Sequence, residues 1–65
     1  MSNEEYMKHA FSVYQNAVAS DGSRKKDLLN QALNILENVP DGYPADPGGA
    51  YPSKADLVSR ITGML

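Results

Sequence analysis

The sequence predicts an all-α fold, an antiparallel helical hairpin followed by a short C-terminal helix, in a single domain spanning residues 1–65. Two long segments carry apolar residues at helical spacing, and only a short polar break separates them. A third, shorter amphipathic segment ends the chain after a stretch rich in proline and glycine. A chain of this length rarely divides into two hydrophobic cores, so one three-helix domain is expected.

The first helix is predicted over residues 3–20. With each residue turned by about 100°, its apolar side chains fall in a stripe roughly 160° wide. Ser2 or Asn3 is expected to cap its start, and Glu4 and Glu5 suit the positive end of the helix dipole. The stripe consists of Tyr6, Met7, Ala10, Phe11, Val13, Tyr14, Ala17 and Val18.

The second helix is predicted over residues 24–38, after the break at residues 20–23. Gly22 can take the left-handed conformation that closes a helix, and Ser23 can cap the next one. Pro40 predicts that this helix ends by residue 38. The short link makes the two helices antiparallel neighbours. The apolar stripe of the second helix is again about 160° wide. It consists of Leu28, Leu29, Ala32, Leu33, Ile35, Leu36 and Val39.

Residues 39–52 are predicted to form an ordered loop rich in proline, glycine and tyrosine. All four prolines and three of the five glycines of the chain lie in this stretch. Pro47-Gly48 fits a type II turn, which places proline second and glycine third. Tyr43 and Tyr51 are large and mostly apolar, so we expect the loop to fold back and press at least one of them onto the hairpin.

The third helix is predicted over residues 53–64. Ser53 followed by Asp56 nearly matches a capping box. A helix of about eleven residues is too short to be stable alone. It must therefore pack on the hairpin or on another chain, through a face made of Leu57, Val58, Ile61, Met64 and Leu65.

Composition argues against most catalytic and metal chemistry. The chain has no cysteine, which excludes disulfides, thiolate zinc sites and a cysteine nucleophile. His9 is the single histidine, so zinc sites with two imidazoles are excluded as well. It falls on the polar face of the first helix, where Glu5 is its one carboxylate neighbour at helical spacing. We therefore expect a solvated histidine and a non-enzymatic protein without cofactor or metal.

The first residues do not predict a targeting signal. The start, Met-Ser-Asn-Glu-Glu, is polar and acidic, unlike a secretory signal peptide. No apolar run reaches the ~18 residues that a membrane span needs. The expectation is a cytoplasmic protein that does not use a membrane.

Arg24, Lys25 and Lys26 form a basic cluster in the first turn of the second helix, where cations oppose the helix dipole. In one interpretation the cluster has no binding role and is a solvated surface turn whose charge Asp21 and Asp27 partly neutralise. In the other interpretation the cluster binds an anion, or binds nucleic acid together with Lys54 and Arg60. The net charge of −2 disfavours nucleic acid as the partner, because such domains usually neutralise phosphates with a basic surface.

The width of the two stripes is the strongest functional indication. Helices with apolar faces of about 160° cannot hide them wholly against each other. Either a three-helix core consumes the surplus, or an exposed apolar patch remains, and such patches usually mark protein interfaces. We favour the second possibility: a small binding or regulatory module whose partner is another protein or a second copy of itself. Its expected binding residues are the aromatic ones, Tyr6, Phe11, Tyr14, Tyr43 and Tyr51.

Overall fold

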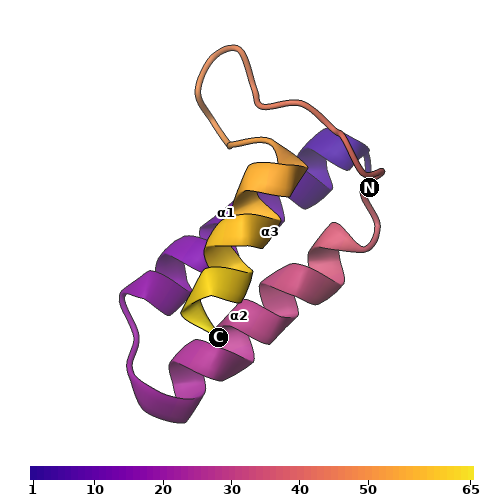
Figure 1. Cartoon of the computed structure of the whole chain (residues 1–65). Helices are drawn as coiled ribbons and strands as arrows, with labels where there is room; N and C mark the ends of the chain where they lie inside the picture. The colour runs from indigo at the N-terminus through magenta and orange to yellow at the C-terminus, as the bar shows by residue number, and fades with distance from the viewer.

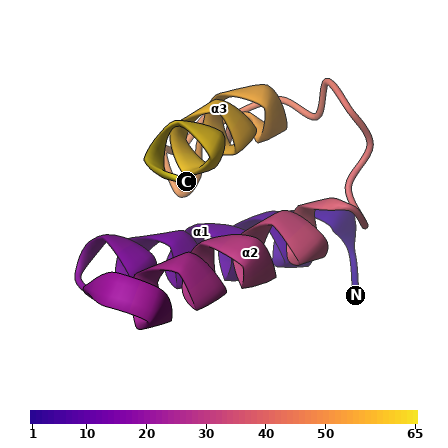
Figure 2. The same cartoon turned by 60° about the horizontal axis from the view of Figure 1, so that its bottom comes forward.

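The computed structural model describes residues 1–65 and confirms an all-α domain of three helices. The helices are α1 (Asn3–Val18), α2 (Gly22–Leu36) and α3 (Lys54–Met64) (Figure 1). α1 and α2 run antiparallel as a hairpin, and α3 lies over one face of that hairpin as a second layer (Figure 2). None of the three helices combines the length and the apolar composition needed to cross a membrane.

The start of α1 is fixed by a capping box. Ser2 is the N-cap, and its hydroxyl accepts a hydrogen bond from the Glu5 backbone N–H at 3.2 Å. In return the Ser2 backbone N–H donates to the Glu5 carboxylate at 3.1 Å. Two backbone donors that the helix itself cannot satisfy are thereby paired. The pKa of Glu5 is lowered, because the Ser2 backbone N–H, and after it the Ser2 side chain, stabilise the Glu5 carboxylate in its ionised form.

The junction between α1 and α2 differs from the expectation. α1 ends at Val18 rather than residue 20, and α2 begins at Gly22 rather than residue 24. Gly22 does adopt a left-handed φ of +61°, but as the first residue of α2. Ser23 as the cap is therefore wrong: the N-cap is Asp21, whose side chain accepts no capping hydrogen bond.

The end of α2 follows from Pro40, as predicted. The helix stops at Leu36, and the Val39 backbone N–H donates to the Leu36 carbonyl at 3.0 Å in a final tightened turn. Pro40 has no N–H to continue this pattern, and it disfavours helical geometry at Val39. Val39 is nevertheless buried, so the chain leaves α2 with its side chain in the core.

The loop is held by its own hydrogen bonds, centred on Asp46. Its carbonyl accepts from the Gly49 N–H at 2.9 Å, its carboxylate accepts from Ala50 at 2.9 Å, and its N–H donates to Tyr51 at 3.1 Å. The predicted turn exists, but type II is wrong, because Gly49 rather than Gly48 has the positive φ, at +83°. Glycine in this fourth position is typical of a type I turn.

Ser53 caps α3 as predicted, accepting from the Asp56 backbone N–H at 3.2 Å. The second half of the capping box is not formed. The Asp56 carboxylate instead makes two hydrogen bonds to the Arg60 guanidinium, at 3.1 and 3.2 Å. Asp56 therefore pairs one turn ahead along α3 and not back toward the cap.

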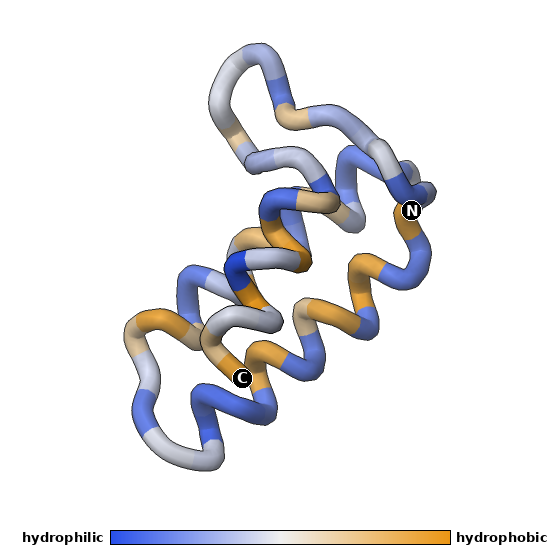
Figure 3. Tube along the Cα trace, viewed as in Figure 1, coloured by the Kyte–Doolittle hydropathy of each residue, from blue (hydrophilic) through white to orange (hydrophobic).

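The core is a single cluster of eleven buried residues drawn from all three helices and the loop. Hydrophobic positions recur along the helices, whereas the loop is mostly polar or neutral in character (Figure 3). Tyr51 belongs to the core with 7% of its surface exposed, so the expectation that one loop tyrosine packs inward is met. The cluster consists of Met7, Ala10, Val13, Ala17, Leu29, Ala32, Leu36, Val39, Tyr51, Leu57 and Ile61.

Replacing Leu57 tests whether α3 is held by burial. Leu57 is 0% exposed, so Leu57→Ala should cost about 2–5 kcal/mol of unfolding free energy, comparable with the whole stability of so small a core. Leu65→Ala, at a residue 49% exposed, should cost under about 1 kcal/mol. Urea denaturation followed by circular dichroism measures both. Equal effects of the two substitutions would show that α3 is not anchored through this face.

Candidate protein-binding surface

The structure divides the predicted aromatic residues between two places. Phe11 and Tyr14 stack on α1, with ring centroids 6.0 Å apart and planes inclined by 17°. Tyr43 and Tyr51 stack in the loop, with centroids 6.4 Å apart and planes inclined by 26°. Tyr6 is half-buried against the core and has no stacked partner. The five residues therefore form two separate aromatic pairs and one single ring.

Within the apolar stripe of α1, Val18 is the one exposed residue. Val13, at one edge, is 9% exposed, whereas Val18, at the other, is 51% exposed. Phe11 and Tyr14 accompany Val18 and are half-buried. Residues 11, 14 and 18 share one side of the helix because of their spacing. We call these three residues the exposed edge of α1.

Val18 belongs to this exposed edge, although it was not among the predicted binding residues. The sequence places Val18 in the apolar stripe, but the predicted binding residues are aromatic and do not include it. The signal was present: α3 has 11 residues against 16 in α1, so it cannot cover the whole stripe. Leu65, the residue after α3, is also half exposed, at 49%.

Tyr51 is a core residue, so its ring is not available to a partner in this conformation. The interaction with the Tyr43 hydroxyl, together with partial desolvation, raises the pKa of the Tyr51 phenol to about 12. Both effects favour the neutral phenol over the phenolate. The loop pair is thus a packing element that fixes the loop onto the helices.

We predict that the Tyr51 phenol ionises at a higher pH than an ordinary tyrosine. Because its pKa in the folded chain is about 12 against 10.0 ordinarily, the neutral form stabilises the fold. That contribution is full below pH 10 and is lost as the pH rises through about 12. Tyrosinate absorbance should show one late-ionising group among the four tyrosines, and Tyr51→Phe should remove it. Simultaneous ionisation of all four near pH 10 would contradict this placement.

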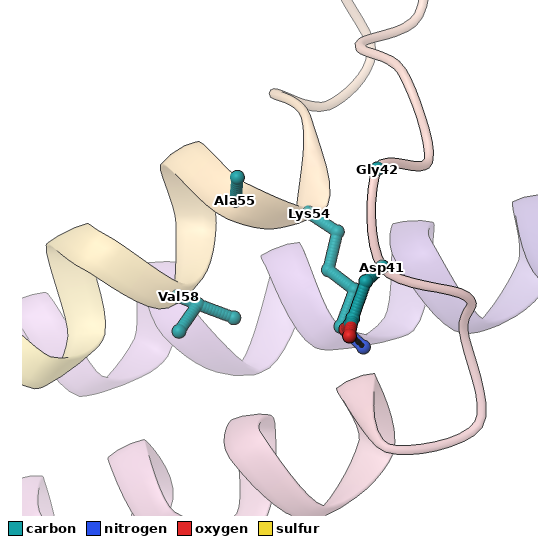
Figure 4. Close-up of a pocket in the computed structure, with 5 residues that line it drawn as sticks. All are labelled: Asp41, Gly42, Lys54, Ala55 and Val58. Atoms are coloured by element: carbon teal, nitrogen blue, oxygen red, sulfur yellow. Dashed lines mark hydrogen bonds and ion pairs between the residues drawn. The ribbon is translucent and has the colours of Figure 1, made fainter.

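Lys54 fastens the loop to the start of α3. Its ammonium donates to the Val39 carbonyl at 2.6 Å and to the Asp41 carboxylate at 2.8 Å, while its backbone N–H donates to the Tyr43 carbonyl at 3.1 Å. The Lys54 side chain is only 12% exposed. We call this set of contacts the Lys54 clasp. Figure 4 shows the side chain of Lys54 reaching across to Asp41.

A small hollow of about 260 Å³ lies beside the clasp. Its walls come from the start of α3 and from the first residues of the loop (Figure 4). The two charged groups in it are already paired with each other, and this pairing lowers the pKa of Asp41 by stabilising its carboxylate. The hollow therefore presents no uncompensated charge. Its lining residues are Asp41, Gly42, Lys54, Ala55 and Val58.

Removing the Lys54 ammonium tests the clasp. Lys54→Met keeps the aliphatic stem but loses both side-chain hydrogen bonds, so the free energy of unfolding should fall by about 1–3 kcal/mol. Lys8→Met is the matched control, because the Lys8–Glu4 ion pair is half exposed on both sides and should be worth under about 0.5 kcal/mol. Urea titrations measure the difference. If Lys8→Met lowered the free energy of unfolding as much as Lys54→Met does, the clasp would have no special role in stability.

The basic residues proposed for anion binding are not brought together. Lys54 is engaged in the clasp, and Arg60 is paired with Asp56 at 3.1 Å. Arg24, Lys25 and Lys26 remain at the start of α2 and make no ion pair. The basic surface is therefore one compact cluster at the α1–α2 turn and not a continuous stripe.

No cluster of candidate metal ligands accompanies these surfaces. His9 is exposed on α1, and no group of three or more histidine, cysteine or acidic side chains is placed to hold a metal ion. No buried side-chain polar atom lacks a hydrogen-bond partner. The features that remain unsatisfied within the chain are apolar, at the exposed edge of α1, and electrostatic, at the start of α2.

Comparison of the chain with known protein families, curated proteins and solved structures finds no significant match.

Proposed function

We propose that this chain is a small, non-enzymatic protein-binding module that uses the exposed edge of α1. The observation that carries the proposal is the 51% exposure of Val18 beside the half-buried Phe11–Tyr14 pair. Half-buried aromatic rings next to an accessible aliphatic side chain are the composition typical of interface centres.

The length of the helices supports this proposal. An amphipathic helix is stable in water when its apolar stripe is covered. Here α3 is too short to cover the whole stripe of α1. α3 contributes 11 residues to a hairpin whose helices have 16 and 15. A partner that covers the remaining edge would bury apolar area that folding alone leaves in contact with water.

A light-activated cross-linker placed on the exposed edge tests the proposal. A photoreactive phenylalanine analogue in place of Val18 should give covalent adducts with protein when the chain is irradiated in its native cells. The same analogue in place of Asn16, which is exposed on the polar side of α1, is the matched control and should give few adducts. Gel shifts and mass spectrometry of the purified chain measure both.

Two outcomes would count against protein binding at this edge. Equal adducts from positions 18 and 16 would mean that contact is unspecific. Salt-sensitive binding of duplex DNA that is lost in Arg24→Ala with Lys25→Ala would favour the alternative function, a small nucleic-acid-binding regulator. That alternative draws its support from the unpaired basic cluster at the start of α2.

A further inference from the structure

We infer that the exposed edge of α1 packs against the same edge of a second copy of this chain, with the two α1 helices antiparallel. This inference rests on the proposed function, because it names the partner of the surface defined there. The apolar edge supplies the contact, and the distribution of charge along the hairpin selects the partner and its direction.

Charge is segregated along the hairpin. The basic cluster, Arg24, Lys25 and Lys26, lies at the end where α1 turns into α2 (Figure 1). The three other basic residues of the chain each form an ion pair with a carboxylate of their own chain. The opposite half holds most of the acidic residues, which are Glu4, Glu5, Glu37, Asp41, Asp46 and Asp56.

The two ends cannot neutralise each other within one chain. α1 has 16 residues, so its ends are about 24 Å apart at 1.5 Å per residue. At physiological salt the Debye length is about 8 Å, and exposed charges separated by more than this are largely screened. Within the chain only Asp21 and Asp27, which flank the basic cluster, offset it, and they leave one positive charge in excess.

An antiparallel second copy places an acidic helix end beside the basic cluster of each chain. Glu4, Phe11 and Val18 are spaced by seven residues, so the apolar edge continues into an acidic residue at the start of α1. When a second α1 lies antiparallel on this edge, the partner's turn, with its basic cluster, comes next to Glu4, which also pairs with Lys8 of its own chain at 3.2 Å. The two-fold symmetry repeats the same pairing at the other end. A parallel arrangement would instead place acidic ends together and basic ends together.

The arrangement also gives a role to residues that are unfavourable within the chain. Arg24 and Lys25 in the first turn of α2, followed directly by Lys26, oppose the helix dipole, and the Asp21 side chain provides no capping bond. A neighbouring acidic helix end would offset this local repulsion. Because the apolar edge is small, the dimer is expected to be weak and to exchange quickly.

A charge-swap experiment tests the antiparallel pairing. Variant one carries Glu4→Lys and Glu37→Lys, which are exposed and leave the capping box of α1 intact. Variant two carries Arg24→Glu and Lys25→Glu, which place acids where the α2 dipole prefers them. Sedimentation of the whole chain should show a dimer for the wild type, and each variant alone should dissociate at least about tenfold more readily, equivalent to roughly 1.4 kcal/mol. An equimolar mixture should recover the wild-type affinity, because both ends of the mixed dimer are again complementary.

Circular dichroism keeps folding separate from association. Variant two should be at least as resistant to urea as the wild type in dilute solution while dimerising less. Val18→Ser should dissociate the dimer without changing its charge, and Asn16→Ser is the matched control on the polar face.

The inference fails if the wild type is a monomer at millimolar concentration, or if the mixed variants associate no better than each alone. Adducts from position 18 with a different protein, together with a monomeric chain, would overturn the dimer and leave the proposed function standing. Absence of specific adducts from position 18 together with a monomeric chain would overturn both.

Discussion

Burial of Leu57 and Ile61 against the hairpin holds this small protein together. Both side chains are fully buried, and they are the two residues by which α3 enters the core. An 11-residue helix has too few backbone hydrogen bonds to persist alone in water, so α3 exists because it is docked. The hairpin gains in the same way, because α1 and α2 cover only part of each other's wide apolar faces and α3 covers more of the remainder. Without disulfides, no covalent link substitutes for this contact.

The positions of the helices were readable from the sequence because they depend on local rules. Periodicity predicted all three, Ser53 was predicted as a cap, and Pro40 marked the end of α2. For α1 the sequence left Ser2 and Asn3 as alternatives, and the cap is Ser2. The start of α2 was misread because Ser23 and Asp21 are both good capping residues, and only backbone geometry decides between them.

Contacts between distant residues could not be predicted in the same way. Lys54 was assigned to anion binding because its charge was visible, whereas its partner carbonyl at Val39 lies 15 residues away and has no sequence signature. Tyr51 was grouped with the surface aromatics for the same reason, since ring type does not reveal whether a loop turns inward. The sequence places Val18 in the apolar stripe of the first helix, but its exposure depends on where α3 ends. The aromatic pairs and the clasp are thus properties of the folded chain and not of any segment in it.

The start of α2 is where local helix rules and the observed sequence disagree most. Acidic residues in the first turn would stabilise that end, but the first turn holds Arg24 and Lys25, with Lys26 directly after them. Asp21 stands at the N-cap and makes no capping hydrogen bond. A domain of this size has little stability to lose, so a locally unfavourable cluster is informative about what lies outside the chain. The apolar edge and the basic turn both remain unsatisfied within the chain, and one neighbouring molecule could satisfy both.

The loop that joins α2 to α3 also acts as a tether. Residues 37–53 connect the two helices, and a short connection of this kind confines the attached segment to an effective concentration in the millimolar range. α3 can therefore stay docked even if its intrinsic affinity for the hairpin is weak. A free peptide with the sequence of α3 would have to be supplied at a comparable concentration to occupy the same place on a hairpin that had lost its own third helix.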